Sequence, residues 1–527
     1  MSFEIQPITI KIYFLQGDFV MNFTVTGLTV ETDGITKEQL ENAKLFSGKN
    51  AGICYMGDSY FDSAVTDPVK ATKRFVNTCK NGHHSIADHV RIEVLLEGSS
   101  KMLAIVLNSL QDYATSEKSG RYTIMTGNSE RETVLYDKWK EIFHNRILEL
   151  YPTYDDEMLL KKFESKYPRS GYTVERGRLK ELEAVLEASK DKEASDYYRD
   201  VLKNDKTLPS WKMAQENARY VLSVFTYSTT FGYSTSLRQW NYIYDWCQKY
   251  LAQYVPKHDE DFIKWYSSDG REGKCTILNK KTNTEASYFE TRLYFDFLTL
   301  SNFIYDNLYV EELRDNKDRC FEFLTQLSGV EDHAMKGYDL SCYEPDGYTG
   351  DFEYEAETRS KDDYYGLVYN TSYTASFVQI AQAERHRTLK YFMFFNPSSS
   401  KQEFFVPPML IDTDYADEWL QDLESVKELV PQATKVCIIE TGHIADFILK
   451  CKERLCGRAQ LEIMQQTAIT AKRFIEDVDA GVITNKACIN YVEQLRGKTG
   501  SVTTKCNMLN CKEPCVWGSK NALTRLI

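Results

Sequence analysis

Glycine and proline are scarce in this sequence, with 26 and 12 residues among 527. This composition excludes a collagen-like chain, and the 42% of hydrophobic and 13% of aromatic residues exclude a mostly disordered one. No low-complexity tract or short repeat is visible. The chain is therefore globular, and its length indicates two domains of roughly 250 residues each.

Long apolar runs are also absent. The longest, such as residues 102–107 and 404–411, fall far short of the roughly 18 residues that a membrane span needs. The first residues show no basic start followed by an apolar block, and the 13 cysteines are an odd number scattered along the chain. We therefore expect a cytoplasmic protein with reduced thiols and no membrane contact.

Long basic runs are missing as well. The 64 Lys and Arg residues are outnumbered by 77 Asp and Glu, which gives a net charge of −13. This balance disfavours a surface that follows a nucleic-acid backbone, so no nucleic-acid partner is expected. A small anionic ligand held by a few Arg side chains is compatible with it.

Hydrophobic periodicity predicts strands and helices in alternation. Residues 1–35 alternate apolar and polar side chains like strands, and Thr36 is suited to cap a following helix. A second helix is expected over 67–81, a strand over 90–97, and a buried helix over 101–109. The first part of the chain is therefore expected to combine strands with flanking helices.

The rest of the chain continues this mixture. Residues 124–212 are rich in charged helix formers and predict a solvated helical insertion. A short helix, a strand and a second helix follow over 214–251, a polar boundary over 256–285, and a hydrophobic strand over 403–410. The predicted class is α+β, with antiparallel or mixed sheets flanked by helices.

Three short motifs carry polar groups suited to chemistry. Residues 81–89, NGHHSIADH, contain three His. A metal site would need a further ligand that is not nearby. The alternatives are a role in packing the loop and a contact with a flavin or a substrate. The loop SEKSGRY at 116–122 has the groups that bind a phosphate, although a plain surface turn has them too. Residues 385–387, RHR, form either an anion clamp or an exposed helix end.

Two further Arg residues lie on segments otherwise built for burial. Arg219 stands in AQENARYVL and Arg454 in CKERLCGRAQLEI. A guanidinium in such a place needs an anionic partner or exposure to water, so each is either part of a salt bridge or a ligand contact.

Taken together, these motifs resemble the flavin-dependent thymidylate synthases. Residues 81–122 resemble that family's GHxSxxEH segment and SxRY loop, with Asp88 where the family usually has Glu, and ENARYVL followed by SLRQW resembles a later block. In the second half, QAERHR, EFFVPP and RLCGRAQLEI resemble the family's RHR motif, the strand after it and its C-terminal helix. The resemblance implies two diverged tandem modules, residues 1–270 and 271–485, before a tail at 486–527.

Each half of the chain lacks a family motif that the other half retains. The first half has Ser-Leu-Gln at 109–111 where RHR is expected, and the second has FFNPSSS where the SxRY loop is expected. Arg454 has only Cys247 as its counterpart, and Arg219 has only Lys427. The family builds its sites between subunits of a homotetramer, so the resemblance implies one composite site per chain and a homodimer that acts as a pseudo-tetramer.

The resemblance assigns roles to residues of both modules. Substrate binding is expected from Glu117, Ser119, Gly120, Arg121, Arg219, Gln382 and Arg385. Cofactor binding is expected from His83, Ser85, Arg238, His386 and Arg387, and catalysis from Ser119, His83 and Arg454.

The implied reaction is the methylation of dUMP to dTMP. FAD would be the cofactor, NADPH the reductant and methylene-tetrahydrofolate the carbon donor. Two alternatives are a related flavin-dependent modification of a pyrimidine nucleotide, such as hydroxymethylation, and an inactive nucleotide-binding or assembly protein.

The tail carries Cys506, Cys511 and Cys515, with Cys488 upstream. This density fits a small knuckle with structural zinc, although the spacing is not CxxC. An iron–sulfur site and unligated thiols are the alternatives, and the family resemblance does not cover this segment.

Overall fold

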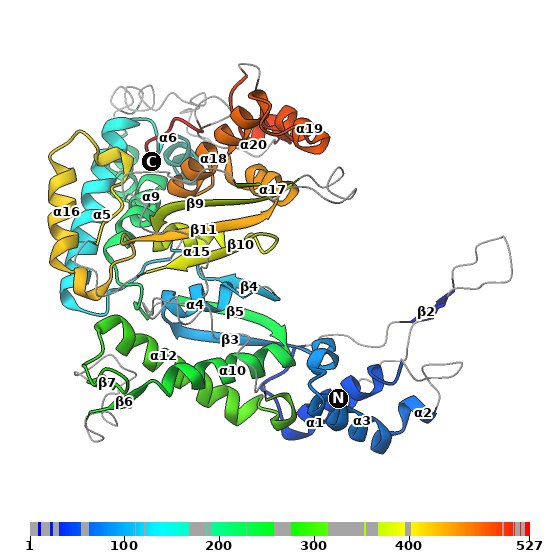
Figure 1. Ribbon diagram of the computed structural model, residues 1–527. Helices are drawn as coiled ribbons and strands as arrows, with labels where there is room; N and C mark the ends of the chain where they lie inside the picture. Colours follow the sequence, from blue (N-terminus) through cyan, green and yellow to red (C-terminus); the bar gives the residue numbers. More distant parts are fainter. Residues whose placement is uncertain are drawn as a thin grey trace. The chain divides into compact units, whose positions relative to one another are not determined.

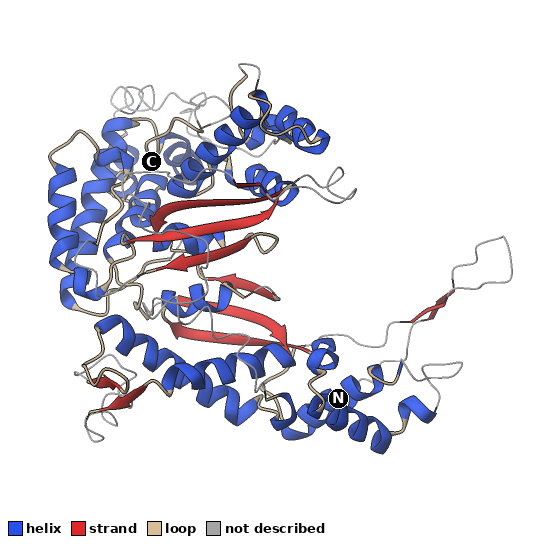
Figure 2. Cartoon of the chain, in the orientation of Figure 1, coloured by secondary structure: helices blue, strands red, loops and turns tan. Residues whose placement is uncertain are grey.

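The fold is seen in a computed structural model of the chain (Figure 1). It describes residues 9–11, 22–24, 31–53, 63–110, 112–120, 123–167, 186, 191–227, 229–257, 276–314, 353–354, 367–395, 402–497, 500–509, 511, 517 and 522–527. Figure 2 shows the mixture of helices and small sheets that the sequence predicted, so the α+β class is confirmed.

The chain divides into two compact units. The first comprises Met1–Glu93, Ser234–Tyr244 and Asn302–Asp315, and the second comprises the remainder. The boundary between them falls within strands β3 and β5 and helices α10 and α12, whose bounds are Arg91–Ser99, Thr229–Ser236, Leu237–Leu251 and Tyr288–Asn307.

The first unit is mainly helical. Its other elements are β1 (Thr9–Lys11), β2 (Asn22–Thr24), α1 (Lys37–Asn50), α2 (Ser63–Thr66), α3 (Pro68–Lys80), η2 (His84–His89) and η5 (Glu311–Leu313). The predicted cap is confirmed, because Thr36 Oγ1 accepts from the Gln39 amide while the Gln39 side chain accepts from the Thr36 amide. Helix α3 packs Phe75 and Cys79 into a core with Leu237 and Val310.

The two larger sheets among the described residues lie mainly in the second unit. One has the order β3-β5-β4, where β4 is Tyr113–Glu117, and the other has the order β10-β11-β9-β8. The strands of the second sheet are β8 (Glu353–Tyr354), β9 (Val368–Ser376), β10 (Lys390–Phe394) and β11 (Lys435–His443), all paired antiparallel.

The same order of elements occurs around both sheets. Strand β3, helix α4 (Lys101–Asn108) and β4 precede β5, which lies between β3 and β4. Strand β9, helix α15 (Phe377–Ala383) and β10 precede β11, which lies between β9 and β10. Each helix begins at a serine cap, because Ser100 Oγ accepts from the Leu103 amide and Ser376 Oγ from the Gln379 amide.

The segments before the two central strands pair with each other. Ser223 and Pro431 form an antiparallel β-bridge. On either side of it, the Val224 amide donates to Val430 O at 3.0 Å and the Gln432 amide donates to Leu222 O at 2.8 Å. The two hydrogen bonds are reciprocal, as they would be across a local two-fold axis.

The helices of the second unit surround these sheets. They are α5 (Glu130–Leu150), α6 (Asp156–Lys166), α8 (Lys192–Asp196), η3 (Tyr197–Leu202), α9 (Pro209–Ala218), η4 (Arg219–Val221), η7 (Pro408–Leu410), α16 (Tyr415–Ser425), η8 (Lys427–Leu429), α17 (Ile444–Arg454), α18 (Leu461–Asp479), α19 (Lys486–Leu495) and α20 (Lys505–Met508). A two-stranded sheet joins β6 (Tyr254–Pro256) to β7 (Ile277–Asn279). Within the described residues, no helix is long and apolar enough to cross a membrane.

The expectation of a solvated insertion over 124–212 is wrong for α5. One face of this helix is buried, and Trp139 on that face meets Trp419 of α16 edge-on with ring centroids 4.7 Å apart. Heavily charged residues on the other face gave the segment its polar composition. Helices α6 and α8 with η3 instead form a small core of their own around Phe163 and Trp211.

The predicted strand over 403–410 is also not present. Phe404 forms only an isolated bridge with Thr434, and residues Pro408–Leu410 form a single 3-10 turn. Pro407 and Pro408 have no amide hydrogen to donate to a strand ladder, which explains why the apolar run does not extend the sheet.

Candidate active site

The second unit holds a cavity of about 260 Å³ whose wall comes from the first sheet, from helices α4, α9, α15 and α17, and from the loops beside them. It is lined by Lys101, Glu117, Lys118, Ser119, Gly120, Met125, Glu216, Arg219, Thr229, Ala381, Gln382, Arg385, Gln432, Arg454, Arg458, Ala459 and Gln460. Seven residues predicted from the sequence lie together here: Glu117, Ser119, Gly120, Arg219, Gln382, Arg385 and Arg454.

Gly120 allows the loop after β4 to lie close to Arg219. A Cβ at this position would stand 3.0 Å from Arg219 Nη1 and 3.1 Å from Met125 Sδ. The loop is fixed from α9, because Gln215 Nε2 donates to Gly120 O at 3.2 Å and also to Thr123 O. The close packing therefore explains why glycine occupies this position.

Glu117 is the buried carboxylate of the cavity, with 3% of its side chain exposed. Lys101 Nζ donates to its Oε1, and Arg385 Nη1 lies 3.6 Å from its Oε2. The ion pair with Lys101 compensates the burial of the carboxylate. Glu117 Oε2 has no hydrogen-bond partner among the described residues, so it can accept from a ligand.

The RHR segment is held against β4. Tyr113 OH donates to Glu384 O at 2.8 Å, and Arg387 Nη1 donates to Tyr113 O, with its guanidinium 5.8 Å from the Tyr113 ring centroid. Arg385 and Gln382 line the cavity at the end of α15. The first sheet thus fixes the segment that carries these two residues.

His386 points away from water. Its side chain is 4% exposed, Nδ1 lies 3.5 Å from Glu453 Oε2, and Nε2 has no hydrogen-bond partner among the described residues. Burial, with Arg454 and Lys450 nearby, lowers the pKa of His386 to about 2. The imidazole is therefore neutral at physiological pH.

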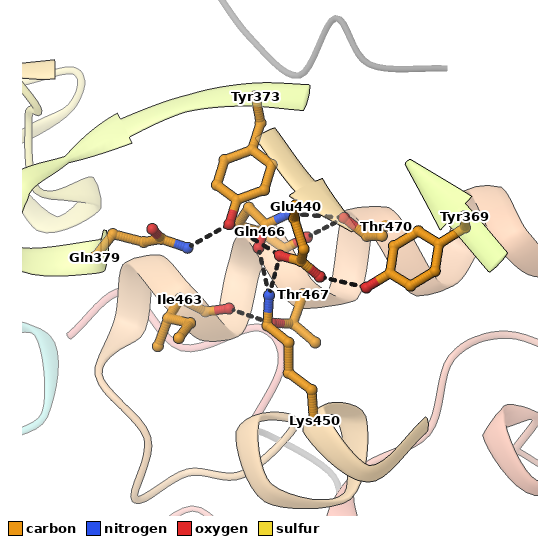
Figure 3. A network of polar contacts seen from close by, with 9 residues as sticks. All are labelled: Tyr369, Tyr373, Gln379, Glu440, Lys450, Ile463, Gln466, Thr467 and Thr470. Carbon is orange, nitrogen blue, oxygen red and sulfur yellow. Dashed lines mark hydrogen bonds and ion pairs between the residues drawn. The ribbon is translucent and has the colours of Figure 1, made fainter. Parts of the chain in front are cut away.

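Arg454 ends helix α17, and burial lowers the pKa of its guanidinium. The helix is anchored one turn earlier by the network in Figure 3, where Lys450 Nζ lies 2.6 Å from Glu440 Oε2 and both side chains are fully buried. Tyr369 and Tyr373 donate to the same carboxylate at 2.7 and 3.0 Å. The network holds α17 on the second sheet and so fixes the place of Arg454.

The cavity is suited to an anion that also carries polar donors. Its wall has six basic side chains against two acidic ones. Three buried polar atoms of lining residues, Glu117 Oε2, Arg219 Nε and Arg454 Nε, lack a hydrogen-bond partner among the described residues. Buried polar groups are usually satisfied, so a polar ligand in this cavity would find three such atoms to bind.

Three predicted site residues belong to the first unit. His83 and Ser85 are exposed on the segment around η2. Arg238 Nη1 lies 2.6 Å from Asp88 Oδ2, and its guanidinium lies 5.1 Å from the Tyr242 ring centroid, while its Nε is buried without a hydrogen-bond partner among the described residues. Asp88 thus serves as the carboxylate partner of this Arg.

Other predicted residues fall outside what the structure describes. Arg121 is one, and Cys515 of the tail is another. Cys506 and Cys511 are half-buried, and the described part of the chain contains no cluster of three potential metal ligands. The zinc prediction therefore stays a prediction.

Sequence reasoning missed Lys101, Glu216, Gln432 and Arg458 of the cavity wall. Glu216 lies beside Arg219 in ENARYVL and could have been included on that ground. Lys101 and Arg458 look like ordinary surface residues at helix boundaries, and only the fold brings them to the cavity.

Comparison with known proteins agrees with this geometry. No curated protein sequence matches the chain. The family model described as thymidylate synthase complementing protein matches residues 41–254, which include the NGHHSIADH segment, the loop after β4 and Arg219. Over residues 41–254, the chain is similar to the family of thymidylate synthase complementing proteins.

Proposed function

We propose that the protein is a flavin-dependent thymidylate synthase that converts dUMP to dTMP at the cavity of the second unit. The observation that carries the proposal is the cavity itself, where the loop after β4, Arg219, the RHR segment and Arg454 meet around three buried polar atoms without hydrogen-bond partners. A nucleotide monophosphate offers both an anion for the Arg side chains and donors for Glu117.

The proposal includes a tandem origin of the chain, with modules at 1–270 and 271–485. It is supported by the equal strand orders β3-β5-β4 and β9-β11-β10 and by the reciprocal hydrogen bonds around Ser223 and Pro431. The family match lies within the first module, so the second module rests on this repeated topology.

Two modules related by a two-fold axis would form two equivalent sites per chain, and we propose that one of them is closed. Lys101 is the first residue of α4, and Phe377 is the first residue of α15. Lys118 directly follows β4, and Phe395 directly follows β10. The two Phe residues therefore correspond to the two Lys residues. Phe377 and Phe395 are buried and meet edge-on with ring centroids 5.3 Å apart. Cys247, the counterpart of Arg454, is fully buried as well. We therefore propose one nucleotide site per chain.

FAD is proposed as the cofactor, and some of the residues that the sequence assigned to it have polar atoms that a ligand could bind. His386 Nε2 and Arg238 Nε are buried polar atoms without hydrogen-bond partners among the described residues, and Arg387, His83 and Ser85 are exposed. When bound, FAD would supply the reducing equivalents that NADPH delivers, with methylene-tetrahydrofolate as carbon donor. A homodimer would bring further copies of these residues together.

The residues of the cavity would divide the work. Arg385, Arg121 and Arg219 would neutralise the phosphate, and the Ser119 and Gly120 amides would donate to it. Glu117 Oε2 would accept from an N–H or O–H of the nucleotide. Arg454, held by α17, would polarise a carbonyl of the uracil ring, which is the electrostatic assistance that ring substitution needs.

The test is product analysis with the full chain. Purified protein supplied with FAD, NADPH, methylene-tetrahydrofolate and dUMP should form dTMP, identified by the mass of the product. A hydroxymethylated nucleotide would replace the proposed reaction with a related one. Absence of both nucleotide binding and bound flavin would favour the inactive assembly protein.

A further inference from the structure

The segment after α20 reaches the wall of the cavity, although the family match does not include it. Arg525 is 2% exposed, and its guanidinium donates from Nη1 to Cys456 O at 3.2 Å and from Nη2 to Ala459 O. A third contact comes from Lys505, whose amide donates to Leu455 O at 2.7 Å. Three backbone carbonyls of one short loop are thus bound by the tail.

This loop joins the two helices that shape one side of the cavity. Helix α17 ends at Arg454, and α18 is capped by the side chain of Gln460, whose Oε1 accepts from the Ile463 amide. Arg454, Arg458, Ala459 and Gln460 all line the cavity. A shift of the loop would therefore move Arg458, whose guanidinium lines the cavity, relative to Arg454.

The tail is itself anchored, so it can hold the loop. Trp517 packs against the ring of Tyr151 with centroids 4.9 Å apart, and the Leu526 amide donates to Tyr151 OH at 3.2 Å. Trp517, Ala522 and Ile527 are buried in the core around α5 and α16. Arg525 thus connects this core to the loop, with its guanidinium 5.9 Å from the Trp517 ring centroid.

The chemistry of the contact requires arginine. A planar guanidinium can donate to two carbonyl oxygens at once from different nitrogens, whereas a lysine ammonium is a point donor on a flexible stem. A small space of about 10 Å³ beside Arg525 is lined by Glu216, Ala459 and Gln460, which also line the main cavity. The guanidinium therefore stands directly behind the cavity wall.

We propose that Arg525 is a positioning residue for the nucleotide site, which it serves by fixing the loop that carries Arg458 and follows Arg454. This role rests on the proposed function. The tail then completes the site in addition to packing on the core.

The experiment is a double-mutant cycle on dUMP binding, measured by calorimetry with the full, flavin-loaded chain. Arg525→Ala should weaken dUMP binding about 10-fold, and Arg525→Lys should weaken it less. Arg458→Ala should weaken it as well, and the double variant should lose clearly less than the two single losses combined, because Arg525 acts through the loop. Arg496→Ala is the matched control and should bind dUMP as the wild type does. It removes an ion pair between Arg496, the residue after α19, and Asp479 at the end of α18.

The outcomes separate the two proposals. Additive losses in the cycle, or unchanged dUMP binding by Arg525→Ala in a wild type that binds, would overturn the positioning role alone. A second measurement distinguishes the positioning role from a simple loss of folding. Millimolar guanidinium ion should restore dUMP binding to Arg525→Ala to a greater degree than to Arg458→Ala. A wild type that binds no dUMP would overturn the proposed function and this role with it.

Discussion

Ser223 and Pro431 lie opposite each other in an antiparallel β-bridge, and each stands four residues after the start of a short 3-10 helix, at Arg219 and at Lys427. The two residues therefore have the same place relative to these short helices. A homo-oligomer with two-fold symmetry makes this kind of contact between chains. Here the relationship is found inside one chain, as a tandem fusion would produce it.

From this relationship we expect one dUMP and one FAD per chain. In this proposal, Phe377 and Phe395 take the places in the second module that Lys101 and Lys118 have in the first, so only one site per chain is expected to bind. Flavin released per polypeptide and the dUMP stoichiometry from calorimetry check the number. Two equivalents of either ligand would mean that the closed site still binds.

The composite site predicts a shared effect of two distant Arg residues. Arg385→Ala and Arg121→Ala should each weaken dUMP binding roughly 10- to 150-fold, since each removes a charge-assisted bond of about 1.5–3 kcal/mol to the same phosphate. The double variant should lose less than the sum, because groups on one ligand are coupled. Arg131→Ala, which breaks only an exposed ion pair with Glu428, is the control. Fully additive losses would place the two residues in separate sites.

Gly120→Ala should damage binding more than folding. The new Cβ would lie 3.0 Å from Arg219 Nη1 and 3.1 Å from Met125 Sδ, so both side chains must shift. Because these are the ends of side chains, we expect a loss of only about 1 kcal/mol in unfolding free energy, with a clear increase in the dUMP dissociation constant. An unchanged dUMP dissociation constant would show that nucleotide binding does not depend on the close contact between Gly120 and Arg219.

Lys450→Met should destabilise the chain by about 3–5 kcal/mol, because it leaves the Glu440 carboxylate buried without its ion-pair partner. The double change Lys450→Met with Glu440→Gln should recover much of this loss, since it removes the unpaired charge. Urea unfolding monitored by circular dichroism gives both numbers. A double variant as unstable as the single one would show that packing, and not charge, dominates at this place.

The sequence predicted local features well where one residue decides them. Thr36 caps α1 as expected, and the helix expected over 67–81 is present as α3, with Pro68 in its first turn. The failures come from tertiary context. Helix α5 looks solvated because its exposed side is charged, while Trp139 on its other side is buried against α16.

The site residues also divide into those that the sequence could predict and those that depend on tertiary packing. Motif order was enough to bring Glu117, Arg219 and Arg385 into one hypothesis, and the fold places all three around one cavity. The pairing of Lys101 with Glu117 and the reach of Arg525 to the loop after α17 depend on how distant segments pack. No local pattern in the sequence contains that information.

His386 should make the protein less stable in mild acid. Its folded-state pKa is lowered to about 2 by burial, with Arg454 and Lys450 nearby and Glu453 at 3.5 Å, while an unfolded His titrates near 6.5. Between these values the unfolded chain binds one proton more than the folded chain, so stability falls as the pH drops below about 6.5. By pH 5 the loss from this group is on the order of 2 kcal/mol.

Asp296, whose pKa burial raises to about 7, contributes with the opposite sign but equally in wild type and variant. Urea unfolding of the wild type and His386→Gln at pH 7 and pH 5 should therefore show a smaller acid loss in the variant, and the His386 ring signals should remain those of neutral imidazole at pH 5. Equal acid losses would mean that the imidazole reaches water or gains a proton through Glu453, in which case it could not offer a neutral Nε2 to the flavin site.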